Sequence, residues 1–210
     1  MINLMVVDDH RVFASSLARV LSEEADINVI AALDTVDGAL DAMTTDIDVV
    51  LIDFRLGVSD GIEATRRIVA GWPDTKVVML TASHDESVMA AALEAGCSGF
   101  VTKSEPLEVV LAAVRGAAIG ESIISPALLG RLLPRLAARP RGRNPELTYR
   151  EQQVLEVMAR GGSNQEIADE LVISRDTVRN HVASILSKLG VNSKLQAVTA
   201  GIQRGLISVG

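Results

Sequence analysis

The chain has 210 residues, a length that suits one large or two small domains. Hydrophobic residues make up 48% of the chain but aromatic residues only 2%, so a core must be built mainly from Val, Leu, Ile, Ala and Met. The single cysteine, Cys97, excludes an internal disulfide, and no apolar run approaches the roughly 20 residues that span a bilayer. With no signal-peptide pattern at the N-terminus, these features predict a cytoplasmic protein without a membrane segment.

The net charge of −7 is spread unevenly along the chain. Residues 1–124 carry 20 acidic and 8 basic side chains, a net charge of −12. Residues 125–210 carry 7 acidic and 12 basic side chains, a net charge of +5. An acidic half joined to a basic half predicts a different partner for each half, and the basic half is the candidate for contact with nucleic acid.

Short apolar runs alternate with amphipathic segments through the first 118 residues. The solid runs are typical of strands buried on both faces of a parallel sheet, and the amphipathic segments have helical spacing. Strands are expected at 4–7, 27–33, 48–53, 77–81 and 99–102, and helices at 10–21, 36–43, 62–70, 86–95 and 107–118. This order predicts a flavodoxin-like (βα)5 unit, an α/β fold with a doubly wound parallel sheet.

Four of the predicted strands end on polar side chains. Asp8 and Asp9 follow the first strand, Asp53 ends the central one, and Thr81 and Lys103 follow the next two. The carboxyl ends of parallel strands meet at one edge of the sheet, so these side chains are expected to lie together. Clustered carboxylates repel one another unless a cation holds them, and their oxygen atoms favour a hard ion such as Mg²⁺.

Together these residues resemble the phosphoacceptor site of the receiver domain of two-component response regulators. The resemblance implies that Asp53 accepts a phosphoryl group from a phosphohistidine on a sensor histidine kinase. It also implies that Mg²⁺ is held by Asp8, Asp9, Asp53 and the backbone carbonyl of Arg55. Gly57 departs from the family pattern, which usually has proline at this point of the loop.

The same resemblance implies roles for three further residues of the N-terminal half. Lys103 is expected to form an ion pair with the acyl phosphate. Thr81 and Phe100 resemble the switch pair of the family, in which the hydroxyl group moves toward the phosphoryl group and the ring turns into the vacated space. Simple core packing remains the alternative role for Phe100.

The segment 121–145 is expected to link the two halves. Leucines between Leu128 and Leu136 have helical spacing, which Pro134 interrupts, and the following stretch is rich in arginine and proline. The predicted domains are therefore a receiver domain at 1–120, this linker, and a second domain at 146–210. The arginines of the linker are interpreted as solvated, with contact to phosphates as the alternative.

Helix-capping patterns divide the second domain into four short helices. Thr148 with Glu151, and Ser163 with Glu166, have the spacing of capping boxes, and Ser174 and Ser193 are expected to begin two more helices. Two short helices joined by a tight turn at 172–174 are typical of a helix-turn-helix unit, a small all-α domain.

The third of these helices has an apolar stripe and an outward face. Outward residues include Arg179, which can bridge guanine O6 and N7, and Asn180, which can pair with adenine N6 and N7. The motifs from Leu147 to Val191 resemble the LuxR-type DNA-binding domain, in which relatives often place a basic base-reading residue where Ala183 stands. The predicted DNA contacts are Thr177, Arg179, Asn180, Ala183, Lys188 and Lys194.

The two resemblances together identify the chain as a member of the NarL/FixJ family of response regulators. They imply a transcriptional regulator of double-stranded promoter DNA, not an enzyme, that dimerises on phosphorylation or DNA binding. A phosphorylation-independent regulator with an atypical receiver domain is the alternative within this class. A phosphoaspartate phosphatase would need a second aspartate at the position of Arg55, and no strand is followed by the Gly-x-Gly-x-x-Gly of dinucleotide-binding enzymes.

Overall fold

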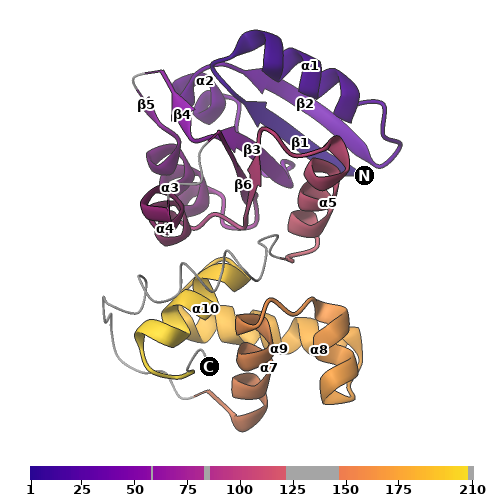
Figure 1. Cartoon of the computed structure of the whole chain (residues 1–210), viewed down its shortest axis with the longest axis vertical. Helices are drawn as coiled ribbons and strands as arrows, with labels where there is room; N and C mark the ends of the chain where they lie inside the picture. Colours follow the sequence, from indigo (N-terminus) through magenta and orange to yellow (C-terminus); the bar gives the residue numbers. More distant parts are fainter. Residues whose placement is uncertain (58, 83–85, 122–146, 208–210) are drawn as a thin grey trace.

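The computed structural model describes residues 1–57, 59–82, 86–121 and 147–207. An N-terminal α/β part is followed by a C-terminal part made of helices (Figure 1). The apolar leucine stripe and the arginine-rich linker predicted between residues 121 and 145 lie almost wholly outside the described residues.

The α/β part contains a sheet of five parallel strands in the order β2-β1-β3-β6-β7. The strands are β1 (Ile2–Val7), β2 (Ile27–Leu33), β3 (Val49–Asp53), β6 (Lys76–Thr81) and β7 (Gly99–Thr102). All residues of β3 are buried, as the solid apolar run predicts for the central strand. The order confirms the doubly wound, flavodoxin-like fold.

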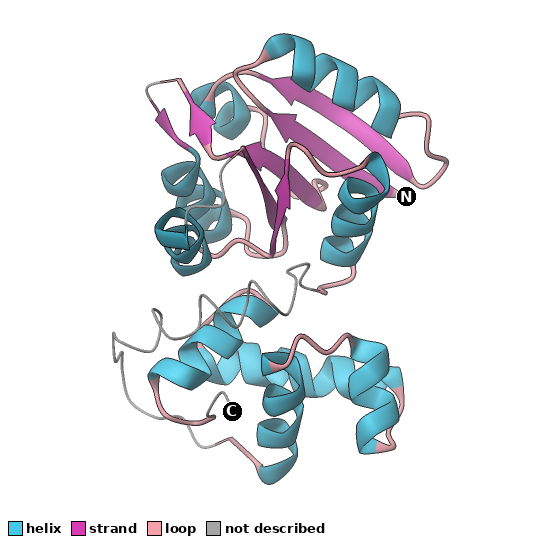
Figure 2. Ribbon diagram, in the orientation of Figure 1, coloured by secondary structure: helices cyan, strands magenta, loops and turns pink. Residues whose placement is uncertain are grey.

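Five helices cover the two faces of the sheet (Figure 2). Alternate residues of each strand belong to different apolar clusters: Met5 and Val50 pack on one face, Leu4 and Val49 on the other. The bounds are α1 (Arg11–Leu21), α2 (Val36–Asp41), α3 (Gly61–Gly71), α4 (Glu86–Ala95) and α5 (Leu107–Ala118). The buried residues of α2, α3 and α4 pack on the first face, and those of α1 and α5 pack on the second.

The loop after β3 contains a small hairpin that the sequence analysis treated only as a loop. Strand β4 (Arg55–Leu56) pairs antiparallel with β5 (Ser59–Asp60). Gly57 lies at the turn with a φ of +62°, a conformation that glycine adopts without the steric cost of a Cβ atom.

The C-terminal part contains the four predicted helices. They are α7 (Tyr149–Ala159), α8 (Asn164–Leu171), α9 (Arg175–Leu189) and α10 (Lys194–Gln203). Both predicted capping boxes are present, and Ser174 and Ser193 each accept a hydrogen bond from a backbone amide of the helix they begin. The turn between α8 and α9 has Val172 in the left-handed region, with a φ of +55°.

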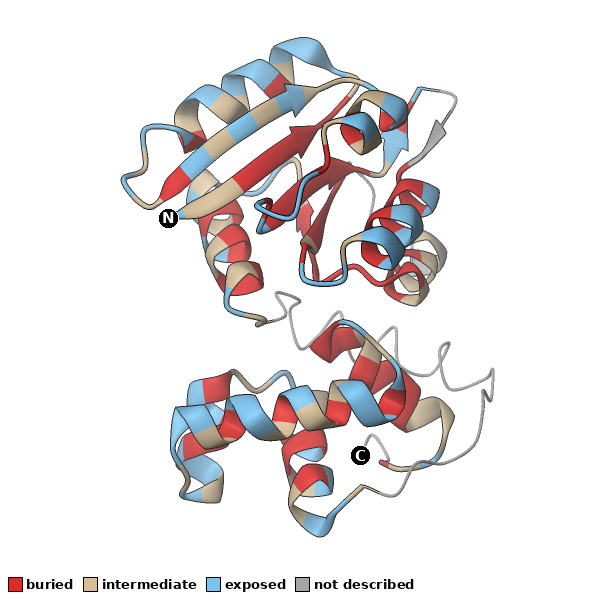
Figure 3. Ribbon diagram, turned by 180° about the vertical axis from the view of Figure 1, so that it is seen from behind, coloured by how far each residue is buried: buried red, intermediate tan, exposed pale blue. Residues whose placement is uncertain are grey.

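The two parts meet where α10 lies against α4 (Figure 1). The hydroxyl group of Ser193, which begins α10, donates a hydrogen bond of 3.2 Å to the carbonyl of Cys97 just after α4. A Cβ atom on Gly96 would lie 3.1 Å from Nε2 of Gln196, so the chains approach closely there. Figure 3 shows buried residues in the helices of both parts, and those of α4 and α10 belong to one apolar cluster.

Gly61 allows α3 to begin directly against the end of β3. A Cβ atom on Gly61 would lie 2.3 Å from the carbonyl oxygen of Asp53. We expect Gly61→Ala to lower the free energy of unfolding by roughly 1–3 kcal/mol, because the backbone at Asp53 and Phe54 must shift to accept the methyl group. Guanidinium denaturation measures the loss.

Gly71→Ala is the matched control for this substitution. Gly71 ends the same helix, and a Cβ atom there would meet nothing within 4 Å. The control should unfold at the wild-type denaturant concentration or slightly above it. Equal stability of the two variants would show that the end of β3 tolerates the added methyl group.

Candidate phosphoacceptor site and nucleic-acid interface

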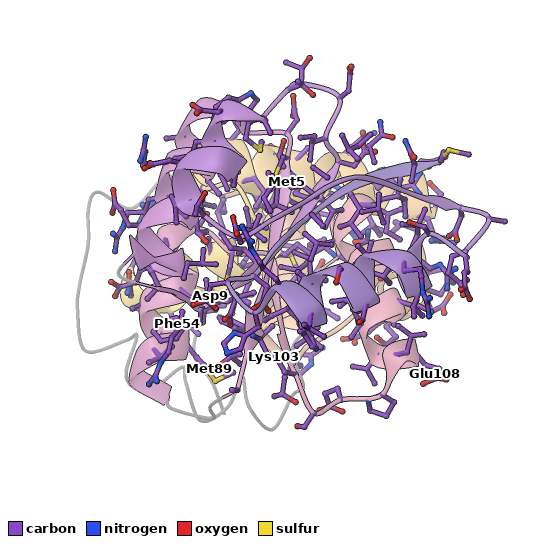
Figure 4. All side chains as sticks on the ribbon, turned by 90° about the horizontal axis from the view of Figure 1, so that it is seen from above. Met5, Asp9, Phe54, Met89, Lys103 and Glu108 are labelled. Atoms are coloured by element: carbon purple, nitrogen blue, oxygen red, sulfur yellow. The ribbon has the colours of Figure 1, made fainter. Side chains whose placement is uncertain are left out.

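The predicted acidic residues gather at the carboxyl edge of the sheet. Ligand atoms of Asp8, Asp9, His10 and Asp53 all lie within 4.8 Å of one another. Nζ of Lys103 lies 2.6 Å from Oδ2 of Asp8 and 2.9 Å from Oδ2 of Asp53. Figure 4 shows Asp9 and Lys103 at this end of the sheet, and the structure brings all four predicted charged residues into one site.

This site holds more negative than positive charge. Burial raises the pKa of Asp53, although the Lys103 ammonium opposes the shift. Burial also acts on Lys103, but hydrogen bonds to Asp8 and Asp53 outweigh it and raise the pKa of the ammonium group. One ammonium group shared by buried carboxylates leaves charge to be neutralised, and carboxylate oxygens at this spacing suit a hard divalent cation.

Two groups that the sequence analysis did not assign also contact Asp9. Nδ1 of His10 lies 2.8 Å from Oδ1 of Asp9, and the amide of Gly57 donates a hydrogen bond of 2.9 Å to Oδ2. Proline has no amide hydrogen, so the family's usual residue could not make the second contact. The departure at Gly57 therefore adds a hydrogen bond to the site.

The predicted switch residues lie on neighbouring strands beside α4. Thr81 is 1% exposed and ends β6, and the amide of Lys103 bonds to its carbonyl at 2.9 Å. Phe100 is 7% exposed and belongs to the same apolar cluster as Met89 and Leu93 of α4. The Phe100 ring is thus already packed inward in this structure.

Helix α9 separates into the two predicted faces. Val178, Val182, Ile185 and Leu189 are buried, which confirms the apolar stripe. Arg179, Asn180 and Ala183 are exposed, and among the described residues the ion-pair partner of Arg179 is Asp176, at 3.0 Å on the surface. Such a pair is easily exchanged, so Arg179 is available to another anionic or polar partner.

Lys188 has an internal partner that the sequence analysis missed. Its Nζ lies 2.6 Å from Oε2 of Glu151, a residue only 4% exposed. Ser184, one helical turn before Lys188, donates a hydrogen bond of 2.6 Å to the other oxygen. The i,i+4 spacing of the two residues gives them one face of α9, but only the fold shows that Glu151 lies against it.

Lys194 lies at the junction of the two parts. Lys194 is 5% exposed and borders a cavity of about 180 Å³. Arg179 and Ala183 of α9 border the same cavity, with Lys76 and Glu121 on the α/β side. In this arrangement Lys194 reaches DNA only if the two parts separate.

Comparison with known proteins matches both parts of the chain. The family described as the response regulator receiver domain matches residues 4–115. The family described as bacterial regulatory proteins of the luxR family matches residues 145–200. The chain is 34% identical to the transcriptional regulatory protein LiaR of Bacillus subtilis over 213 residues, covering 99% of this chain and 100% of LiaR.

Solved structures of response regulators have the same fold. The crystal structure of the response regulator ChrA of a heme-sensing two-component system is 34% identical, covers 98% of each chain, and aligns with a TM-score of 0.52. RcsB of Salmonella enterica serovar Typhimurium bound to the promoter rprA is 22% identical, covers 98% of this chain and 100% of its own, and aligns with a TM-score of 0.56.

The chain thus combines a receiver domain with a LuxR-type domain, and it matches such relatives over their full length. The chain belongs to the NarL/FixJ family of response regulators, and it is a transcriptional regulator activated by phosphorylation. Within the described part of the chain, no helix is both long and apolar enough to cross a membrane.

The Glu151–Lys188 contact predicts a pH-dependent stability of the helical part. Burial opposes ionisation of Glu151, but hydrogen bonds from Lys188, Ser184 and Thr148 outweigh it and lower its pKa from 4.5 to about 2. A lowered carboxyl pKa stabilises the fold above about pH 4.5, and the contribution is lost as pH falls toward 2. We expect Lys188→Met to remove roughly 1–3 kcal/mol at pH 7 and to flatten this acid dependence.

Thermal unfolding followed by circular dichroism between pH 3 and pH 7 tests this expectation. Arg160→Met is the control, because it breaks an ion pair of the same 2.6 Å length to Glu170 whose side chains are 59% and 53% exposed. The control should change stability little at either pH. A Lys188→Met protein as stable as wild type at pH 7 would contradict the structural role of the pair.

Proposed function

We propose that Asp53 is the residue on which this regulator is phosphorylated by a sensor histidine kinase. The observation that carries the assignment is the ion pair of 2.9 Å between Asp53 and Lys103 inside the cluster of carboxylates. Asp53 lies at the carboxyl end of the central strand, where its carboxylate is buried at the edge of the sheet that binds ligands in folds of this class.

The chemistry is a transfer of one phosphoryl group between two nucleophiles. An Asp53 oxygen attacks phosphorus, the nitrogen–phosphorus bond of the phosphohistidine breaks, and the imidazole leaves. Lys103 pairs with the charge on the new acyl phosphate. Asp8, Asp9, Asp53 and the Arg55 carbonyl would hold Mg²⁺, which offsets negative charge on the transferring oxygens when bound.

Phosphorylation is proposed to act on the DNA-binding part through α4. Thr81 ends β6 next to the site. Phe100, on the adjacent strand β7, belongs to the same apolar cluster as Met89 of α4. Movement of the Thr81 hydroxyl group toward the phosphoryl group changes the packing available to Phe100. Because α10 covers α4, such a change weakens the contact that holds the two parts together.

The separated α9 is proposed to read the major groove of double-stranded DNA. Arg179, Asn180 and Ala183 form its outward face, which borders the junction with the α/β part in this structure. Thr177 precedes them in the first turn of α9, and two copies of the chain in a dimer engage two half-sites. Lys188 contacts a phosphate only by exchanging its bond to Glu151.

The first test concerns the acceptor residue. Full-length protein with Mg²⁺ and a small phosphodonor should gain one base-labile phosphoryl group, and Asp53→Asn should gain none because its amide is a poor nucleophile. Asp9→Ala should lose labelling and Mg²⁺ affinity together. Asp74→Asn, which changes a loop aspartate before β6, is the control and should label like wild type.

Equal labelling of wild type and Asp53→Asn would place the acceptor elsewhere. The same samples, incubated with the DNA site selected from a random pool, report the coupling. Phosphorylated wild type should dimerise and bind the site more tightly than unphosphorylated protein, whereas Asp53→Asn should not respond to the donor.

The second test concerns base reading. Arg179→Ala and Asn180→Ala should each relax the preference at one position of each half-site, by roughly 1–3 kcal/mol of discrimination. Arg160→Ala removes the same charge from an exposed position outside α9 and should leave the base preference unchanged. Binding curves on the selected site and its single-base variants, at matched salt, measure the effect. An Arg179→Ala protein with full base preference would remove this residue from the reading face.

A further inference from the structure

The cavity between the two parts is surrounded by positive charge. Helices α8 and α10 both begin at it, with Asn164 and Lys194 as their first residues. Helix N-termini carry partial positive charge and unpaired amide donors. Lys76 and Arg179 add two cations, and Glu121 is the only carboxylate among the described residues that border the cavity.

A buried lysine borders this cavity. Lys194 is 5% exposed, and burial lowers the pKa of its ammonium group to about 8, with attraction to Glu121 as the opposing influence. A buried cation beside two helix N-termini indicates a site for an anionic ligand.

Glu121 supplies the anion that this site now contacts. Its Oε1 atom accepts a hydrogen bond of 3.4 Å from the backbone amide of Asn164, the first residue of α8. Glu121 follows α5 by three residues and belongs to the acidic half of the chain. A carboxylate at the N-terminus of one helix and near the lysine of another occupies the position that suits a phosphate group.

The chemistry of the site and its place in the fold select the ligand. Backbone amides at a helix N-terminus and a lysine bind phosphate oxygens without reading bases. Arg179 and Ala183, on the proposed base-reading face of α9, border the same cavity. A DNA strand lying along that face therefore places backbone phosphates where the N-termini of α8 and α10 converge.

We propose that the N-termini of α8 and α10, with Lys194, form a binding site for a backbone phosphate of DNA, and that Glu121 occupies this site as an internal substitute. The inference rests on the proposed DNA-binding function and adds a residue that opposes it. Glu121 and DNA compete for the same amide and ammonium donors, so the α/β part blocks a phosphate contact.

Removal of the Glu121 charge should favour DNA binding without any phosphodonor. Unphosphorylated full-length Glu121→Gln should bind a mixed-sequence DNA duplex about 3–10-fold more tightly than wild type. The log–log dependence of affinity on salt should steepen by about one unit, as expected for one additional phosphate contact. A mixed-sequence duplex suffices because the contact does not depend on base sequence.

Glu108→Gln is the matched control. Glu108, labelled in Figure 4, is an exposed residue in the first turn of α5, whereas Glu121 follows the other end of that helix. Glu108→Gln removes the same net charge as Glu121→Gln, so a gain in DNA affinity that comes only from net charge appears in both variants. The double variant Glu121→Gln with Lys194→Met should lose most of the gain and the steeper salt dependence, because the freed donor is absent.

The outcomes separate this inference from the proposed function. A Glu121→Gln protein that binds like Glu108→Gln overturns the internal substitute, even if a phosphodonor still activates the wild type. A tighter Glu121→Gln protein whose gain survives Lys194→Met also overturns the shared site. A gain that requires Lys194 supports it, including in the case where the phosphodonor has no effect on wild type and the coupling to Asp53 fails. Circular dichroism confirms that each variant is folded.

Discussion

The structure depends on an imbalance of charge at the carboxyl edge of the sheet. The topology brings Asp8 and Asp53 from neighbouring parallel strands to one point, and Lys103 lies within ion-pair distance of both. Each carboxylate is held there by a buried strand, so repulsion cannot be relieved by moving apart. Carboxylates held in this way favour a bound cation, and the phosphoryl transfer proposed for Asp53 changes the balance of charge again.

A buried charge also shapes the junction of the two parts, but there the charge is positive. Helix α10 covers α4 with apolar contacts, yet its first residue is a lysine with little access to water. The cost of burying that charge weakens a contact that the apolar surfaces favour. A junction balanced in this way can respond to a modest change in the packing of α4, which is what a regulated contact requires.

Much of the fold and of the acidic site was predictable because both depend on local patterns. Solid apolar runs predicted the strands, and a parallel sheet brings the carboxyl ends of its strands to one edge. Asp8 and Asp53, which follow Val7 and Ile52, were therefore expected to lie together at that edge. The partners of Lys188 and Lys194 were not predictable, because each depends on how helices distant in the sequence pack. The hairpin β4–β5 was missed because two-residue strands carry no periodic signal.

The uneven charge of the chain gains a second meaning from this arrangement. An acidic half and a basic half predict separate partners, a kinase and DNA, but in one chain they are also partners of each other. The acidic part and α9 border the same cavity, with Glu121 at the N-terminus of α8. Because DNA is itself a dense array of negative charge, an acidic domain is well suited to compete with it for the same donors. In the proposed function, charge asymmetry helps to keep the unphosphorylated regulator off DNA and attracts it there once the parts separate.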